Sequence, residues 1–382
     1  MKLSGIVCEY NPFHKGHKFH IEETKRKTDC DGVVAVMSGN FVQRGEGAVF
    51  SKEVRAKAAI DAGADLVLEL SPFFSVRSAE QFALGAVKIL SSIPEIKYIS
   101  FGAEEEDTEK IKKAAEILIN EPEDYKAALK EELKKGVSYP VARENALLKI
   151  GEDDAAKVLK EPNNILGVEY LKAIKRLDSN ISPVSVKRIG AGHDSLKREE
   201  TVSASYLRGA FYSGDERDFV SGLPEEVVQG FLDATSLNKS GFEKMIFSKI
   251  ITMSEDELRE ISEVSEGLEN RIKKAAQNSK SFDELLTNVK SKRYTLSKIR
   301  RILLCAGLGI KKEEFYSLPP YAKILAFSEN GQRILNTIKK SSDIPVIKNM
   351  TALKRLKDNH MIDLYLKEAE LDRLYSLYTE EQ

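Results

Sequence analysis

The sequence predicts an α/β fold with a parallel sheet, followed by an all-α C-terminal region. Short apolar runs alternate with helical patterns before residue 190, which is typical of βαβ units. Beyond Gly214 the apolar residues keep a helical period to the end of the chain. A chain of 382 residues has room for two or three domains. We therefore expect domains at 1–215 and 216–382, with a helical insertion at about 104–160.

The first residues of the chain predict a strand, a turn and a helix, in that order. Leu3 to Cys8 is an apolar run long enough for one buried strand, and Asn11-Pro12 then halts regular structure. A helical pattern follows from about Gly16 to Lys27. A second strand at 33–37 ends in a polar, glycine-containing loop at 38–46. The later expected elements are a helix at 51–63, a strand at 65–70, a helix at 79–90, strands at 98–103 and 183–189, and helices at 225–237, 241–251, 254–263, 267–277, 281–289 and 297–306.

Composition excludes several classes of protein. The chain is 42% hydrophobic and 31% charged, which suits a soluble protein with a core, and its net charge of −1 means that nucleic acid would need a local basic patch. No apolar run is long enough to span a membrane, so we expect no membrane association. Three scattered cysteines fit a reducing, cytoplasmic location and argue against disulfides or a cysteine zinc site. No protein partner is indicated.

Three of the five histidines fall within seven residues, at His14, His17 and His20. Surface polarity is one interpretation of this cluster. A zinc site is a second, although no cysteine pair stands nearby and H-x-x-H lacks the glutamate of the helical zinc motif. The third is phosphate chemistry, because imidazoles at a helix N-terminus stabilise charge on a transferring phosphoryl group. Gly16 would let a nucleotide approach the backbone closely.

Polar residues near the ends of later strands could join this site. The loop at 38–46 contributes Asn40, Gln43 and Arg44, and a plain connector is the alternative interpretation. Asn163 and Asn164 open a helix, where they could be simple caps. The other candidates are Arg188 at the end of the fifth strand, and Ser203, Ser205 and Arg208 in the segment 201–208, whose hydroxyls and guanidinium suit phosphate.

The strongest basic stretch is 290–301, with six cations and one aromatic ring in twelve residues. It could be the solvated start of a helix. Alternatively it contacts an RNA backbone, with the tyrosine stacking on a base. The candidates for RNA contact are Lys292, Arg293, Tyr294 and Arg300.

His14-Lys15-Gly16-His17 and the segment 201–208 resemble the two motifs of the nucleotidyltransferase superfamily, in the same order and about 190 residues apart. The whole chain resembles the tRNA(Met) cytidine acetate ligases. The stretches that carry this likeness are 5–17, 37–45, 162–167 and 291–294. The resemblance implies a Rossmann-like nucleotidyltransferase domain. It also implies an enzyme that activates acetate with ATP and acetylates N4 of the wobble cytidine of elongator tRNA(Met).

The resemblance also implies a set of site residues. His14 and His17 would be catalytic, no metal site of the protein's own is implied, and ATP would be accompanied by Mg²⁺. A small-molecule nucleotidyltransferase of the same fold and a non-enzymatic RNA-binding protein are the competing hypotheses. The implied ATP-binding residues are Val7, Cys8, Glu9, Tyr10, Asn11, Pro12, Phe13, His14, Lys15, Gly16, His17, Lys18, Phe19, His20, Gly102, Asn163, Arg188, Ser203, Ser205 and Arg208.

Overall fold

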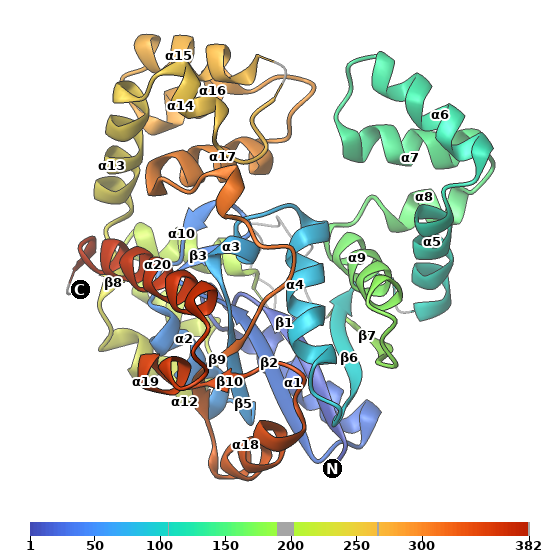
Figure 1. Cartoon of the computed structure of the whole chain (residues 1–382), viewed down its shortest axis with the longest axis vertical. Coiled ribbons are helices and arrows are strands. Elements are labelled where there is room, and N and C mark those ends of the chain that lie inside the picture. The colour runs from blue at the N-terminus through green and yellow to red at the C-terminus, as the bar shows by residue number, and fades with distance from the viewer. Residues whose placement is uncertain (106, 189–201, 266, 381–382) are drawn as a thin grey trace.

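The computed structural model describes residues 1–105, 107–188, 202–265 and 267–380 of the chain (Figure 1). Its centre is a seven-stranded sheet in the order β10-β9-β5-β2-β1-β6-β7. The five predicted strands are all present in this sheet and pair in parallel, so the predicted Rossmann-like class is confirmed. They are β1 (Leu3–Cys8), β2 (Gly32–Ser38), β5 (Leu66–Leu70), β6 (Ile96–Ala103) and β7 (Ser182–Lys187).

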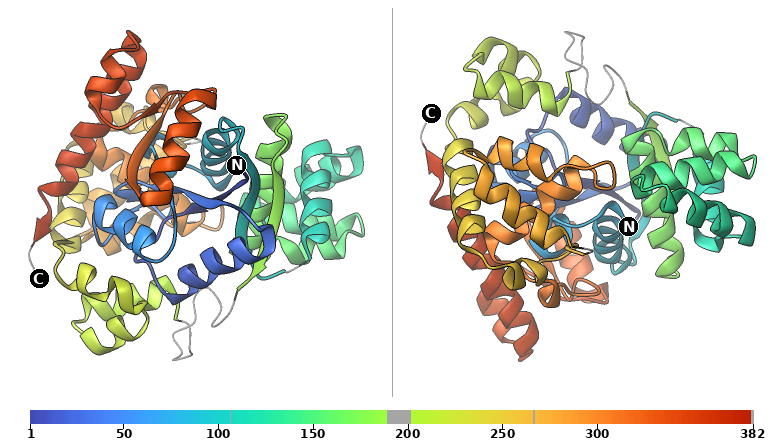
Figure 2. Two further views of the ribbon diagram at one scale, coloured as in Figure 1. Left: turned by 90° about the horizontal axis from the view of Figure 1, so that it is seen from below. Right: turned by 90° about the horizontal axis from the view of Figure 1, so that it is seen from above.

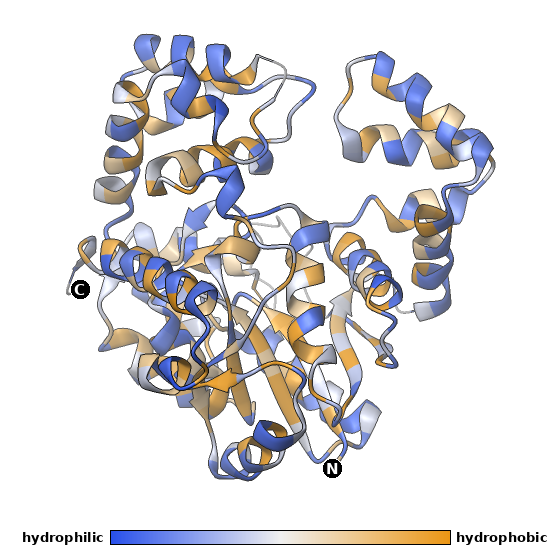
Figure 3. Cartoon of the chain, viewed as in Figure 1, coloured by the Kyte–Doolittle hydropathy of each residue, from blue (hydrophilic) through white to orange (hydrophobic). Residues whose placement is uncertain are grey.

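Helices cover both faces of the sheet because the central strands are apolar on both sides. Val33 and Ala35 of β2 belong to a core shared with α1 (Lys15–Thr28) and α2 (Lys52–Asp61). Val34 and Val36 point to the opposite core. That core includes α4 (Ala79–Ser91) and α9 (Pro162–Arg176). Continuous apolar runs of this kind are typical of strands that are buried on both faces. Figure 3 shows these strands as the most hydrophobic part of the chain.

Two helical lobes stand on the side of the molecule away from the N-terminus (Figure 1). One is the expected insertion between β6 and α9. The other is a bundle that follows β8 (Ser236–Leu237). Seen from above in Figure 2, the orange bundle lies over the middle of the molecule and the green insertion lies to its side. The insertion comprises α5 (Thr108–Asn120), α6 (Glu123–Lys134), α7 (Tyr139–Lys149) and α8 (Asp153–Val158), and the bundle comprises α13 (Lys239–Thr252), α14 (Glu255–Arg259), α15 (Leu268–Asn278), α16 (Phe282–Val289) and α17 (Leu296–Leu308).

The C-terminal region is largely helical, as expected, but it is not all-α. After the bundle the chain returns to the sheet, where β9 (Ala322–Phe327) pairs antiparallel with β5 and β10 (Val346–Ile347) pairs parallel with β9. The prediction missed these strands because each is short and its apolar positions also fit a helical period. Residues beyond 215 therefore build both the bundle and one edge of the sheet. The helices beside β9 and β10 are α18 (Glu329–Ser341), α19 (Met350–Lys354) and α20 (Asn359–Ser376).

Among the described residues, no helix is both long and apolar enough to cross a membrane.

Shorter elements complete the fold. The loop after β2 forms a small hairpin of β3 (Phe41–Val42) and β4 (Glu46–Gly47). The other elements are α3 (Pro72–Ser75), α10 (Ala204–Tyr212), α11 (Glu216–Ser221), α12 (Glu225–Leu232), a 3₁₀ turn at Lys312–Glu314, and β11 (Thr379–Glu380), which pairs with β8.

Candidate active site

The two histidines of the H-x-G-H motif cap helix α1. His14 is the N-cap residue, and its Nδ1 accepts a hydrogen bond from the Gly16 amide at 3.0 Å. The Nδ1 atom of His17 accepts one from the His14 amide at 3.2 Å, so the pair closes a reciprocal capping box. The two rings stack with their centroids 3.7 Å apart. The local sequence thus fixes both rings at the N-terminus of the helix.

This capping determines which ring nitrogen carries the proton. A neutral imidazole has one donor nitrogen and one acceptor nitrogen. Because Nδ1 of His14 and of His17 accepts from a backbone amide, Nε2 must carry the hydrogen in each neutral ring. Both rings therefore offer an Nε2–H donor at the N-terminus of α1, where the helix dipole favours an anion.

His20 lies one turn further along α1 and is held by strand β6. Its Nε2 atom is 3.0 Å from the Ser100 hydroxyl, which also lies 2.7 Å from the Thr24 hydroxyl. Burial lowers the pKa of His20 to about 4, with a further contribution from the Arg188 charge. Burial, followed by the charges of Arg188 and Arg208, lowers the pKa of His14 to about 3. The histidines are therefore neutral at pH 7 when no anion is bound.

Acid should destabilise the fold through these rings, of which His14 is buried and His20 is half-buried. A histidine with a depressed folded-state pKa stabilises the fold above its unfolded pKa of 6.5, and this stability is lost as the pH falls toward the folded value. We expect His20 to contribute a loss of about 1.4 kcal/mol per pH unit in that window. Denaturant unfolding at pH 6.5 and pH 5 measures it. His20→Gln should flatten the dependence, whereas His360→Gln at an exposed position should not. If the free energy of unfolding changed with pH by the same amount in both variants, the effect could not be assigned to His20.

Arg188 reaches the site from the end of β7, and Asn163 orients it. The guanidinium Nη1 of Arg188 donates to Asn163 Oδ1 at 3.3 Å, and the Arg188 amide donates to the Ala103 carbonyl at 3.1 Å. Gly102 lies beside the Arg188 side chain, whose Cγ would be 3.4 Å from a Cβ at this position. Asn164 has a different role, since its buried Oδ1 accepts from the amides of Glu104 and Glu105. Of the two asparagines, only Asn163 contacts an arginine of the site.

The second motif meets the first through Arg208. Ser203 caps α10, and its hydroxyl accepts from the Tyr206 amide at 3.2 Å. The Arg208 side chain donates from Nη1 to the Asn11 carbonyl at 2.8 Å and from Nη2 to the Ser205 hydroxyl at 3.2 Å. The tertiary fold thus brings together motifs about 190 residues apart in sequence. Ile189 and Thr201, which the sequence analysis placed at the ends of these segments, lie outside the described residues.

The site is therefore two neutral histidines at a helix N-terminus, flanked by two arginines. A family model described as HIGH Nucleotidyl Transferase matches residues 1–382. The chain belongs to the HIGH nucleotidyl transferase family. The tRNA(Met) cytidine acetate ligase of Caldanaerobacter subterraneus subsp. tengcongensis is 44% identical over 371 residues, covering 95% of this chain and 92% of that protein. The tRNA(Met) cytidine acetate ligase of Acetivibrio thermocellus is 40% identical over 364 residues, covering 91% and 88%.

Solved structures of this family share the whole fold. Apo Thermotoga maritima TmcAL is 33% identical to this chain and superposes with a TM-score of 0.93, covering 99% of this chain and 95% of that one. Thermotoga maritima TmcAL bound with alpha-thio ATP is also 33% identical, with a TM-score of 0.90 and the same coverage. The resemblance drawn from the motifs is thus confirmed over the full length of the chain.

A buried arginine that the motifs did not indicate supports this HIGH-family site. Arg55 of α2 is 0% exposed and donates to the backbone carbonyls of Glu9, Gly39 and Phe50. It therefore ties the loop after β1 to the loop after β2. Glu9 adds a second tie, since its carboxylate accepts from the Gln43 amide at 2.6 Å. In sequence, Arg55 was visible only as one of several cations on a helix.

Residues of the loop at 38–46 pack against other parts of the protein. Asn40 is buried; its amide donates to Asp372 at 3.0 Å and its Oδ1 accepts from the Lys52 amide at 2.8 Å. Gly45 has a φ of +82°, and a Cβ there would lie 2.4 Å from the Arg301 amide nitrogen. Only glycine allows the loop to approach α17 so closely. Asn40 and Gly45 thus act as structural parts of the loop.

The predicted RNA residues fall into two groups. Lys292 and Arg293 are exposed just before α17, and Tyr294 packs partly against the core with the Lys298 ammonium 5.1 Å from its ring. Arg300 instead turns toward the nucleotidyltransferase part, where its Nη1 lies 3.7 Å from Glu46 Oε2. The bundle therefore presents cations both on its surface and toward the family's motif residues.

Proposed function

We propose that the protein is an ATP-dependent ligase that activates acetate as acetyl-adenylate and transfers the acetyl group to N4 of the wobble cytidine of elongator tRNA(Met). The observation that carries this proposal is the convergence of His14, His17, Arg188 and Arg208 at one helix N-terminus. High identity to ligases of this name over almost the whole chain supports the choice of reaction.

ATP would lie along the stretch from Val7 to His20, with its triphosphate at the N-terminus of α1. Asn163 and Arg188 would contact it from one side, near Gly102. Ser203, Ser205 and Arg208 would hold its β- and γ-phosphates from the other side. No three His, Cys, Asp or Glu side chains group into a metal site in the parts of the chain that the structure describes. Mg²⁺ would therefore be carried mainly by the phosphates, which suits its preference for phosphate oxygens and water.

In the first step an acetate oxygen attacks the α-phosphorus of ATP. An O–P bond forms to acetate, the bond to the β-phosphate bridging oxygen breaks, and pyrophosphate leaves. Both reactants are anionic, so their repulsion must be offset. The Nε2–H donors of His14 and His17 and the two guanidinium groups are suited to stabilise the charge that develops on the phosphoryl oxygens.

In the second step the N4 amine of cytidine attacks the acetyl carbonyl carbon. A C–N bond forms, the C–O bond of the mixed anhydride breaks, and AMP leaves with the bonding electrons. The exocyclic amine of cytidine is a weak nucleophile, which explains the need for an activated acyl donor. The reaction also needs the wobble base to leave its stack, a cost of a few kcal/mol that is least for an unpaired loop base.

The test is incubation with ATP, radiolabelled acetate and total tRNA, followed by nucleoside analysis. We expect label in N4-acetylcytidine of elongator tRNA(Met), with a strict requirement for ATP. Labelling from acetyl-coenzyme A alone, or no labelled tRNA, would overturn the proposal. The same experiment separates it from a small-molecule nucleotidyltransferase, which would consume ATP without modifying tRNA.

Reversing the charge of Lys292 and Arg293 to glutamate should weaken tRNA binding and leave ATP binding unchanged. Both side chains are exposed, so we expect no loss of stability. The affinity of the unmodified protein for tRNA should also fall as salt rises, through counterion release. Filter binding at several salt concentrations measures both effects. Reversal of Lys339 and Lys340 on α18 is the control, and equal losses in the two variants would place the RNA surface elsewhere.

A further inference from the structure

A cavity of about 470 Å³ lies between helix α10 and the helical bundle. Arg208 and Tyr212 reach it from α10, and Arg300 reaches it from α17. Its size is within the range of small-ligand sites. The cavity therefore joins a motif residue proposed for ATP to a bundle residue predicted for RNA, and it offers room for a second ligand beside the nucleotide.

The walls of the cavity combine positive charge with an apolar surface. Among the described residues that line it, four are cationic and two are acidic. Phe242 and Phe282 belong to the apolar part of the lining. The net positive charge of the lining suits the phosphates of a polynucleotide, and its apolar side chains suit a base. The lining is thus complementary to a nucleotide that enters from a longer strand.

Tyr212 offers a ring on which a base can stack. Its side chain lies one turn after Arg208 on α10, and the residue is 40% exposed. The Lys239 ammonium lies 5.6 Å from the ring centroid, where it can also meet a phosphate. Stacking of a base on an exposed aromatic ring is the usual way in which proteins hold a single-stranded nucleotide.

Glu46 supplies an acceptor for an amino group. Its Oε1 atom is buried and has no hydrogen-bond partner among the described residues. The Arg208 Nε is 3.4 Å from this oxygen, and the Arg300 Nη1 is 3.7 Å from the other carboxylate oxygen. Buried polar atoms are rarely left unsatisfied. The exocyclic amine of cytosine would donate the hydrogen bond that this oxygen lacks.

We propose that this cavity seats the acceptor cytidine, with the base stacked on Tyr212 and its N4 amine donating to Glu46. This inference rests on the proposed function and adds the acceptor site to it. When N4 forms its bond to the acetyl carbon and AMP leaves, the amine must lose one proton. The Glu46 carboxylate is placed to accept that proton and to release it to solvent afterwards.

Filling the cavity from α10 tests the proposal. Gly209 lines the cavity, and a Cβ built there meets nothing within 4 Å. Gly209→Phe should therefore fold normally, keep acetate-dependent ATP–pyrophosphate exchange, and lower acetyl transfer to tRNA at least tenfold. Gly230→Phe is the matched control, because Gly230 also lies in open space on a helix and does not line the cavity. It should leave both activities unchanged.

Tyr212 provides a second, independent measurement. Tyr212→Leu should lower kcat/KM for tRNA at least tenfold, and Tyr212→Phe should restore most of it, since only the ring is required. Normal transfer by Gly209→Phe would overturn the proposal. If Gly209→Phe raised the KM for ATP in the ATP–pyrophosphate exchange assay, the proposal would also be overturned, because the cavity would then hold the triphosphate. Absence of exchange and transfer in the unmodified protein would instead refute the proposed function itself.

Discussion

Replacing His14 or His17 with asparagine is expected to lower the rate of acetyl-adenylate formation about 100-fold or more, because each change removes one donor to the transferring phosphoryl group. Asparagine is chosen for its geometry. Its side-chain oxygen can take the place of Nδ1, which caps α1 in both histidines. What it lacks is the Nε2–H group on the far side of the ring. The variants should therefore lose chemistry and keep the helix.

Two measurements separate the chemical role from the structural one. Acetate-dependent exchange of labelled pyrophosphate into ATP reports adenylate formation. Denaturant unfolding measures the stability that the cap of α1 contributes. The free energy of unfolding of the asparagine variants should lie within about 1 kcal/mol of that of the unmodified protein. Alanine variants should lose both activity and about 1 kcal/mol of stability. Exchange at the normal rate in His14→Asn or His17→Asn would show that these rings only cap the helix.

The region around His14 was predictable from sequence because its determinants are local. An apolar run, an Asn-Pro turn and a helical period specify strand, loop and helix within 28 residues. Arg208 was found because its motif is also local. The contact that joins Arg208 to the Asn11 carbonyl spans 197 positions, and only the fold reveals it.

Long-range pairing accounts for most of what the sequence did not reveal. Strand β9 is six residues long and joins the sheet beside β5, more than 250 residues earlier in the chain. No local pattern specifies such a partner. Asn163 and Asn164 are adjacent and chemically identical, and only their different neighbours distinguish them. Arg55 and Glu46 have roles that depend on the backbone carbonyls and side chains that surround them in the folded protein.

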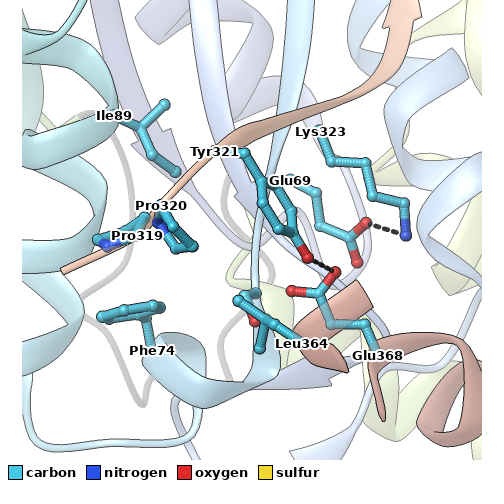
Figure 4. A pocket seen from close by; sticks show the side chains of 10 residues that line it. Glu69, Phe74, Ile89, Pro319, Pro320, Tyr321, Lys323, Leu364 and Glu368 are labelled. Carbon is cyan, nitrogen blue, oxygen red and sulfur yellow. Dashed lines mark hydrogen bonds and ion pairs between the residues drawn. The ribbon is translucent and has the colours of Figure 1, made fainter. Parts of the chain in front are cut away.

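A buried ionic network fastens the C-terminal helix α20 to the sheet. Lys52 contacts both Glu69 and Asp372, while Lys323 lies 3.0 Å from Glu69 and 3.7 Å from Asp372. Burial alone would raise the pKa of Glu69, but the two ammonium groups hold it below its usual value. Figure 4 shows Lys323 directed to Glu69 and Tyr321 donating to Glu368. Burial, with the Glu69 charge, raises the pKa of Glu368 to about 7.

Lys52→Met should destabilise the protein by about 3–5 kcal/mol, because it leaves the buried carboxylate of Glu69 and the half-buried carboxylate of Asp372 with one remaining lysine. The Lys52 side chain is only 3% exposed, so water cannot replace the ammonium group. Urea unfolding followed by circular dichroism measures the loss. Lys57→Met is the control on the same helix, since Lys57 forms an exposed pair with Asp61 and should change stability by less than about 1 kcal/mol.

A double variant tests whether the charges of this network are coupled. Removing Lys52 together with the charge of Asp372 leaves Lys323 paired with Glu69, so the double variant Lys52→Met, Asp372→Asn should recover a large part of the stability lost in Lys52→Met. Asparagine at 372 can still accept the hydrogen bond from Asn40. If the losses of the two single variants simply added, the charges would not be coupled. If Lys52→Met cost no more than Lys57→Met, the network would not hold α20 in place.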